Sequence, residues 1–332
     1  MREALSGLRY HAPMDAPLRL AVAQIAPVLL DRDATLAKVL ERVHEAGEAR
    51  ADLVCFGEAL VPAYPVWTER TDGARFEGAA GKELHARYVD QAVTIEAGHL
   101  DALCETARAR RVAVQLGIIE RPSARGQSLY CASVHVDATG AIRSAHRKLV
   151  PTFEERLSWA PGDGHGLVVH ELGAFRVGAL NCWENWMPLA RAALQAQGET
   201  LHVMHWPGCR RNTEPVTRFL AREGRSFAVS ACGLLRAEDV PADLPYRARI
   251  APEPGELLLD GGSCVAGPDG EWLLEPVVGE ECLRVVELDP ALVRRERQNF
   301  DPAGHYARPD VLRLCVDRRR QTVADFDDGS SS

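Results

Sequence analysis

Apolar runs of strand length alternate with segments of helical periodicity along most of this chain. Residues 18–26 (LRLAVAQIA) and 175–182 (FRVGALNC) are typical of buried strands, whereas Leu36, Leu40 and Val43 recur at helical spacing. Strands that alternate with helices build layered proteins in which the helices cover the faces of a sheet. The pattern therefore predicts an α/β fold.

The remaining elements follow from the same periodicities. Asp33 is the expected N-cap of the first helix. Strands are predicted at 18–26, 52–58, 111–120, 175–182, 200–207 and 281–289, on both sides of a turn within 128–149, and within 261–277, where GPDG (267–270) is a tight turn. Helices are predicted at 31–52, within 80–110, at 188–198 and at 217–231.

The domain organisation is predicted to be simple, because no linker-like tract or repeat divides the chain. Residues 1–17 are expected to be a flexible leader and residues 18–299 a single domain. Residues 300–314 (FDPAGHYARPDVLRL) are expected to be an extended segment, and residues 315–332 a disordered tail in which the arginines at 318–320 are solvated.

Composition excludes several classes of function. The formal net charge of −8 predicts no general affinity for nucleic acid or anionic membranes. Residues 18–30 are interrupted by Gln24 and followed by no clear cleavage site, so they indicate a strand rather than a signal peptide, and no run reaches the length of a membrane span. Nine cysteines at wide spacings indicate free thiols in a reducing compartment, so a cytoplasmic location is expected.

Three reactive side chains stand at the predicted carboxyl ends of strands, where α/β proteins collect functional groups. They are Glu58, Lys148 and Cys182. If their strands share one sheet, the three side chains meet at one edge. A glutamate in apolar surroundings suits acid–base chemistry because burial raises its pKa. Only three of the 39 basic residues are lysines, and Lys148 alone of these ends a strand, which favours a specific need for an ammonium group.

Cys182 permits several interpretations on its own. It could be a core thiol, half of a disulfide, a metal ligand or a nucleophile, although a helix start behind it favours the thiolate. A metal site is disfavoured because the nearby His202 and His205 fall on opposite faces of a strand. His146 is only a weak candidate for a histidine partner, so the residues favour a cysteine–carboxylate–lysine site.

Seven segments in order make the chain similar to the nitrilase superfamily of carbon–nitrogen hydrolases, and to its nitrilase branch in particular. They are FGEALVPAYPVW (56–67), HRKLVPTFEERLSWAPGDG (146–164), NCWENWMPLAR (181–191), LHVMHWPG (201–208), EGRSFAVSACG (223–233), GGSCVAGPDG (261–270) and FDPAGHYARPDV (300–311). The resemblance implies a four-layer α-β-β-α sandwich. Gly57 and Ala63 depart from the family pattern, in the loop that carries Glu58.

The resemblance also implies a site and a reaction. It assigns the catalytic glutamate to Glu58, the lysine to Lys148, the nucleophile to Cys182 and a lysine-supporting glutamate to Glu155. It implies hydrolysis of a nitrile to the carboxylic acid and ammonia, with no metal or organic cofactor. Four aromatic residues in or beside the matched segments are candidates for an apolar substrate pocket: Tyr64, Trp67, Trp183 and Trp206. Packing alone would equally account for many of the tryptophans.

Other functions remain open at this level. The same groups would hydrolyse an amide, an N-carbamoyl compound or cyanide, and the fold could also serve as a non-catalytic scaffold. Family members commonly pair through the helices that flank the site and extend into larger assemblies or spirals. A small-molecule nitrile and further copies of the chain are therefore the expected partners.

Overall fold

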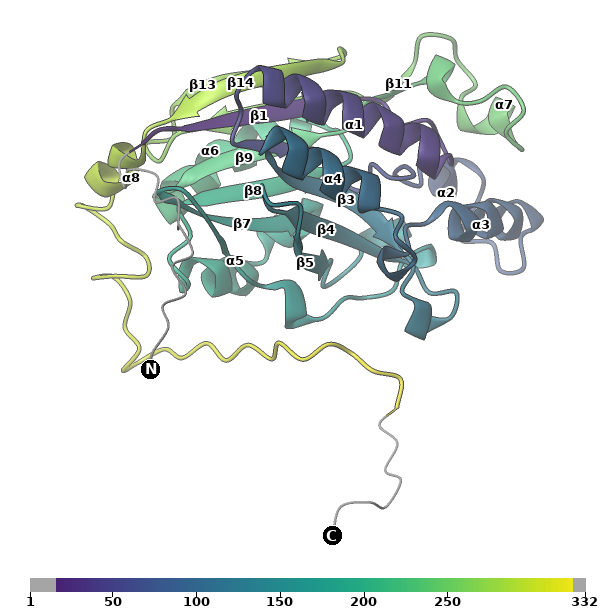
Figure 1. The fold of residues 1–332 in the computed structure, drawn as a ribbon. Coiled ribbons are helices and arrows are strands. Elements are labelled where there is room, and N and C mark those ends of the chain that lie inside the picture. Colours follow the sequence, from purple (N-terminus) through teal and green to yellow (C-terminus); the bar gives the residue numbers. More distant parts are fainter. Residues whose placement is uncertain (1–15, 325–332) are drawn as a thin grey trace, which may run out of the picture.

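The computed structural model describes residues 16–324 of the chain and contains two six-stranded sheets (Figure 1). The first has the strand order β14-β1-β2-β3-β4-β5, and the second β13-β12-β9-β8-β7-β6. The first sheet comprises β1 (Leu18–Gln24), β2 (Leu53–Cys55), β3 (Ala113–Glu120), β4 (Tyr130–Val136), β5 (Ile142–Arg147) and β14 (Cys282–Leu288). The second comprises β6 (His170–Leu172), β7 (Phe175–Asn181), β8 (Leu201–Trp206), β9 (Phe227–Cys232), β12 (Gly261–Ala266) and β13 (Trp272–Val278).

The two sheets pack face to face and helices cover their outer faces. A buried cluster between the sheets joins Leu20 and Leu53 of the first sheet to Val177 and Val203 of the second. The outer face of the first sheet packs against α1 (Arg32–Glu48) and α4 (Asp101–Arg110), and that of the second against α5 (Pro188–Gln195) and α6 (Arg210–Gly224). The predicted four-layer α-β-β-α sandwich is therefore confirmed.

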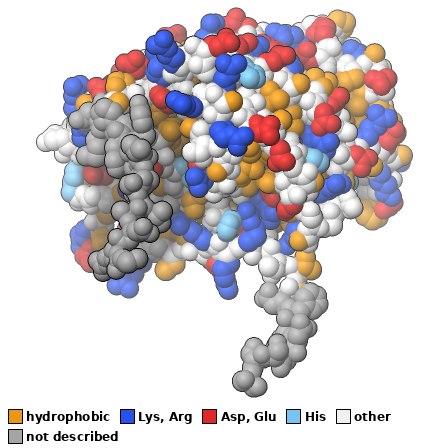
Figure 2. Space-filling model, viewed as in Figure 1, with side chains coloured by type: hydrophobic (Ala, Val, Ile, Leu, Met, Phe, Trp, Pro, Cys, Tyr) orange, Lys and Arg blue, Asp and Glu red, His pale blue; other side chains and the backbone are white. Residues whose placement is uncertain are grey.

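Smaller elements complete the fold. They are the helices α2 (Trp67–Arg70), α3 (Ala79–Gln91), α7 (Arg247–Ile250) and α8 (Pro290–Glu296), the short pair β10 (Leu235–Arg236) and β11 (Leu257–Leu259), and several 3₁₀ turns. Within the described residues no helix is both long enough and apolar enough to cross a bilayer. Basic and acidic side chains intermingle on the face shown in Figure 2.

The directions of the strands bring the carboxyl-terminal ends of several strands in both sheets to the same side of the molecule. Strands β1, β2 and β3 are parallel, and β4 is antiparallel to both β3 and β5. Strand β5 therefore runs in the same direction as β2. In the second sheet, β7, β8 and β9 are parallel. The two sheets meet at these ends, where the backbone N–H of Glu58 donates to the carbonyl of Trp206 at 3.0 Å.

Three local predictions are wrong. Asp31, not Asp33, caps α1, because its side chain accepts from the N–H of Ala34. The helical stretch within 80–110 is two helices, separated at Gly98 in the left-handed conformation. The predicted helix at 217–231 ends at Gly224, and Arg225 in the left-handed conformation turns the chain into β9.

The segment after α8 contains no helix or strand through residue 324 and runs along the body (Figure 1). Arg320 was expected to be solvated, but its guanidinium donates to Asp163 at 3.1 Å and to the carbonyl of Ala145 at 3.0 Å. The domain limits remain predictions. Most of the proposed leader, 1–15, and the end of the tail, 325–332, lie outside the described residues.

Candidate active site

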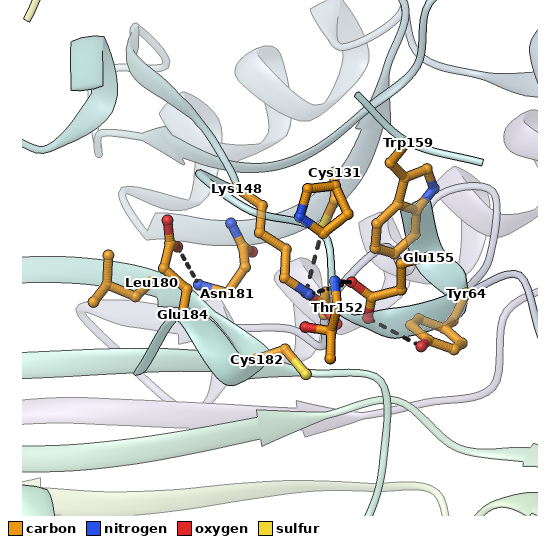
Figure 3. A network of polar contacts seen from close by, with 12 residues as sticks. Tyr64, Cys131, Lys148, Thr152, Glu155, Trp159, Leu180, Asn181, Cys182 and Glu184 are labelled. Atoms are coloured by element: carbon orange, nitrogen blue, oxygen red, sulfur yellow. Dashed lines mark hydrogen bonds and ion pairs between the residues drawn. The ribbon is translucent and has the colours of Figure 1, made fainter. Parts of the chain in front are cut away.

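The three reactive side chains predicted from strand ends converge, but from two sheets rather than one. Glu58 follows β2 and Lys148 follows β5 in the first sheet, whereas Cys182 follows β7 in the second. A carboxylate oxygen of Glu58, one of Glu155 and the Sγ of Cys182 all lie within 4.8 Å of one another. Figure 3 shows Lys148, Glu155 and Tyr64 in this cluster beside Cys182.

Lys148 is the centre of the cluster. Its Nζ donates to Oε1 of Glu58 at 2.9 Å and to Oε2 of Glu155 at 2.7 Å, and it lies 5.5 Å from the ring centroid of Trp159. Burial alone would lower the pKa of Lys148, but the negative charges of its neighbours raise it well above its usual value. Lys148 is therefore a buried, charged ammonium group.

Glu58 has the properties of an acid–base group. Burial raises its pKa to about 7, against the opposing effect of Lys148. Its Oε1 also accepts from the thiol of Cys131 at 3.5 Å, whereas its buried Oε2 has no hydrogen-bond partner among the described residues. One carboxylate oxygen is thus fixed, and the other is available to take a proton.

Cys182 has a strained backbone. Its φ is +48°, in the left-handed region, which non-glycine residues occupy at a cost of about 1–3 kcal/mol. Burial and the charges of Glu58 and Glu155 raise the pKa of the thiol well above its usual value. The expected thiolate is therefore wrong for the resting site, because the single 3₁₀ turn that begins at Cys182 does not outweigh two nearby carboxylates.

Glu155 is fixed by both of its carboxylate oxygens. Its Oε2 accepts from the backbone N–H of Thr152 at 2.6 Å as well as from Lys148, which closes a capping box at the start of a 3₁₀ turn. Its Oε1 accepts from the hydroxyl of Tyr64 at 3.0 Å. Burial raises the pKa of Tyr64 well above its usual value, so this hydroxyl stays a donor.

Glu184 is a site residue to which sequence reasoning gave no role. Its buried carboxylate accepts from the backbone N–H of Asn181 at 3.0 Å (Figure 3) and from that of Leu149 at 2.9 Å, and it pairs with Nε2 of His146 at 3.0 Å. Burial would raise the pKa of Glu184, but His146 and these N–H groups lower it. Glu184 thus joins the segment before Cys182 to the segment after Lys148. Its place in the run NCWENW was the only sequence signal.

The aromatic candidates for a substrate pocket divide into two groups. Tyr64 contacts the cluster directly, and the Trp183 side chain beside Cys182 is 48% exposed. Trp67 is buried edge-on against Tyr88, and Trp206 is buried in the cluster that also contains Cys182. Trp67 and Trp206 therefore pack around the site as part of the core.

The donor atoms of Glu58, Glu155 and Cys182 would suit a divalent metal ion by type. However, the ammonium of Lys148 binds both carboxylates at hydrogen-bond distance, so a metal ion would meet a buried positive charge. The cluster therefore fits a lysine-centred site better than a metal site.

Comparisons with known proteins agree with this arrangement. The family model for carbon–nitrogen hydrolases matches residues 19–298. The chain is 38% identical over 311 residues to Nitrilase 2 from an unknown prokaryotic organism, which covers 93% of this chain and 96% of that protein. It is 35% identical to an aliphatic nitrilase from Sinorhizobium fredii (strain HH103), over 92% of this chain and 97% of that protein.

Solved structures agree in fold. An amidase of the nitrilase superfamily from Nesterenkonia AN1 superposes with a TM-score of 0.63 at 19% identity, covering 88% of this chain and 97% of that chain. In another structure of that amidase, acrylamide has added to the active-site cysteine. At this identity the likeness bears on the fold alone. The family model and the relatives together establish that this chain belongs to the carbon–nitrogen hydrolase family.

Proposed function

We propose that this protein is a nitrilase that hydrolyses an organic nitrile to the carboxylic acid and ammonia through covalent intermediates on Cys182. The observation that carries the proposal is the buried cluster of Glu58, Lys148, Glu155 and Cys182, in a chain whose relatives over nine-tenths of its length are named nitrilases. Such a cluster supplies a nucleophile, a base and a cation at the place where negative charge develops.

In the first half of the reaction, Glu58 takes the thiol proton and the sulfur attacks the nitrile carbon. One C–N π bond breaks as the C–S bond forms, and Lys148 gives a proton to the nitrogen, which completes a thioimidate. Glu58 returns the proton that it took from sulfur to Lys148 through their 2.9 Å hydrogen bond, so Glu58 is a base again. Lys148 stabilises the developing charge on nitrogen, and the backbone N–H of Trp183 assists. Glu155 keeps Lys148 charged and oriented through the 2.7 Å hydrogen bond.

In the second half, Glu58 activates water, which adds to the thioimidate carbon. Ammonia then leaves and a thioester remains on Cys182. A second water hydrolyses the thioester, releases the carboxylic acid and returns the proton to sulfur. The raised pKa of Glu58, about 7, suits a group that must both accept and give a proton near neutral pH. Every proton is carried by this chain or by water, so the proposal requires no cofactor.

An amidase is the nearest rival, because the same residues would form a thioester from an amide. The nitrilase names of relatives at 35–38% identity favour the nitrile, whereas the amidase likeness at 19% identity bears only on the fold. We propose that Tyr64 and Trp183 contact the substrate and that Trp67 and Trp206 shape the pocket from behind.

The test is ammonia release from a panel of aliphatic and aromatic nitriles and their matched amides. The proposal predicts release from at least one nitrile, with equal amounts of acid and ammonia. Release from amides alone would make the protein an amidase, and release from neither would favour the scaffold.

We also propose that the protein is cytoplasmic and forms a homo-oligomer through the outer layer of α5 and α6. All nine cysteines are unpaired, as expected in a reducing compartment.

The proposed interface lies on the outer surface of α5 and α6. Leu189 on α5 and Phe219 on α6 are 68% and 56% exposed. Phe219 lies in a hollow that also contains Arg218, Arg222, Glu214 and Glu223. A surface that carries both charge signs around an apolar side chain can pair with a second copy across a two-fold axis. The apolar residues of 300–314, such as Leu312, would extend the contact.

A further inference from the structure

A chain of three buried polar side chains leads to the backbone of Cys182 from behind the active site. Nδ2 of Asn185 donates to the carbonyl oxygen of Cys182 at 2.8 Å. Oδ1 of Asn185 lies 2.8 Å from Nε2 of His202, and Nδ1 of His202 lies 2.8 Å from Oε1 of Glu199. None of the three residues is more than 3% exposed. The mechanism above uses none of them.

The direction of these hydrogen bonds is fixed by what each atom can do. Nδ2 of Asn185 faces two carbonyl oxygens, those of Cys182 and Leu180, which can only accept. Oδ1 of Asn185 therefore faces His202, and Nε2 of His202 must carry a hydrogen. One further proton lies between Nδ1 of His202 and Oε1 of Glu199. The three hydrogen bonds thus connect Glu199 through His202 and Asn185 to the carbonyl of Cys182.

The end of this hydrogen-bonded chain coincides with a strained backbone in the site. Cys182 is a non-glycine residue with a φ of +48°, and such conformations persist where the surroundings hold them firmly. Asn185 is held in turn on its other side, because Nη1 of Arg191 donates to its carbonyl oxygen at 2.7 Å. The chain therefore contacts the one peptide whose conformation directs the sulfur.

The strand before Cys182 makes room for the chain. A Cβ atom at Gly178 would lie 2.0 Å from Oε1 of Glu199, closer than atoms can approach. Glycine at 178 therefore lets the Glu199 carboxylate reach His202. Gly178, Cys182 and Asn185 stand within eight residues of sequence. This short stretch therefore supplies the sulfur, the amide that bonds to its backbone and the space that Glu199 needs to reach His202.

We propose that Asn185, His202 and Glu199 are positioning residues that hold Cys182 in its strained conformation and direct its sulfur toward Glu58 and Lys148. The proposal deepens the proposed function and rests on Cys182 being the nucleophile. The three residues act through the peptide of Cys182.

A matched pair of substitutions at His202 tests the chain. Glutamine places its amide nitrogen near the position of Nε2, so His202→Gln keeps the donor to Asn185. Asparagine places its amide near Nδ1, so His202→Asn keeps the contact with Glu199 and loses the donor. We expect His202→Asn to lower kcat about 10- to 100-fold with little change in KM, the usual scale for partners of catalytic groups, and His202→Gln to retain more kcat. His170, which lies on β6 and bonds Ser144 at 2.7 Å, is the control, and His170→Asn should leave kcat unchanged.

Alkylation of Cys182 by iodoacetamide is the second readout, followed by mass spectrometry of its peptide. It reports the placement of the sulfur without nitrile turnover, so it separates this proposal from the proposed function. If iodoacetamide alkylates Cys182 of the wild type but the protein hydrolyses no nitrile, the proposed function is wrong. Slower alkylation of Cys182 in His202→Asn would still support the positioning role of Asn185, His202 and Glu199. If both His202 variants keep wild-type kcat and alkylation rates per folded molecule, Asn185, His202 and Glu199 contribute only to packing, and the proposal is overturned.

A variant that fails to fold does not end the test. Asn185→Asp keeps an acceptor for His202 but places an oxygen, instead of a donor, against the carbonyl of Cys182. We expect it to lower both kcat and the alkylation rate at least 10-fold, the scale of such outer contacts. Wild-type values for folded Asn185→Asp would overturn the proposal.

Discussion

At the scale of single residues, Lys148 is the side chain whose chemistry a close substitute should not reproduce. Arginine keeps the positive charge, but its guanidinium is wider and does not give up a proton near neutral pH. Lys148 is buried between two carboxylates, so the larger group has no room to keep both contacts. Lys148→Arg should lower kcat by roughly 100-fold or more, the scale for loss of one well-placed electrostatic donor.

The matched control for this prediction is Lys82→Arg, because the Lys82 side chain is 62% exposed and its ammonium group pairs with the exposed carboxylate of Glu77, away from the active site. Its kcat should equal that of the wild type when one good nitrile is assayed with all variants. If Lys148→Arg retains more than about a tenth of the rate, well short of that scale, Lys148 contributes only charge.

Glu58 links the site to stability. Two buried carboxylates share one ammonium, and the pKa of Glu58 in the folded protein, about 7, lies above its ordinary value of 4.5. The folded protein therefore binds more protons than the unfolded chain between these values, so the stability contributed by Glu58 is present at low pH and is lost as the pH rises toward 7. Glu58→Gln should increase the free energy of unfolding at pH 8 by roughly 3 kcal/mol, the free energy that corresponds to a pKa raised from 4.5 to about 7, and Tm should rise with it.

The same variant should show little stabilisation at pH 5, where the wild-type carboxyl already holds a proton in the fold. Thermal unfolding of both proteins from pH 5 to 8 checks the trend, and ammonia release should be abolished throughout. A Tm difference that stays constant with pH would contradict the raised pKa.

At the scale of elements, the loop after β2 is more sensitive than the start of α1. A Cβ atom at Gly57 would lie 2.3 Å from the backbone nitrogen of Gly233, so Gly57→Ala must displace the backbone beside Glu58. We expect Gly57→Ala to lower kcat sharply. Asp31→Ala removes only the cap of α1 and should lower stability by about 0.5–2 kcal/mol with kcat unchanged. Urea unfolding and steady-state kinetics on both variants separate the two effects, and equal kcat values would show that the loop tolerates the shift.

The apolar runs that precede Glu58, Lys148 and Cys182 were enough to predict that the three residues meet, because each run is a strand and all three strands end where the two sheets come together. The partition into two sheets could not be predicted, because period and length do not say which strands pair. The helix predicted at 217–231 was too long, because the apolar residues of FAVSA (227–231) are compatible with a helix as well as with a strand.

The site itself was only partly predictable. Glu155 rested on the family resemblance rather than on any pattern, and its neighbour Glu154 differs only in its place on the 3₁₀ turn. Glu184 and Asn185 could not be found from sequence, because a polar residue after a strand usually faces solvent. Glu184 is buried against His146 of the opposing sheet, 38 positions away in sequence, and Asn185 against His202, 17 positions away. The periodicity of a sequence gives no information about contacts between residues so far apart.

At the scale of the whole molecule, the exposed apolar side chains of the outer layer predict self-association. Light scattering at micromolar concentration should give at least a dimer. Phe219→Glu should weaken the assembly, because it places a charge in the apolar centre of the proposed interface. Removal of residues 300–332 should also reduce its size. Phe76→Glu is the control, because Phe76 is exposed in the loop between α2 and α3, outside α5, α6 and residues 300–332. A monomer in the wild type would refute the proposed interface.

The central claim is that Cys182 carries the substrate as a covalent intermediate. The most direct measurement is mass spectrometry of the protein quenched during turnover of a slow nitrile, with the digest searched for every cysteine-containing peptide. We predict an adduct of the acyl or thioimidate mass on the peptide that contains Cys182 and on no other, and no turnover in Cys182→Ala that retains the wild-type circular dichroism spectrum. An adduct on another cysteine, such as Cys131 beside Glu58, or ammonia release by Cys182→Ala, would contradict the mechanism.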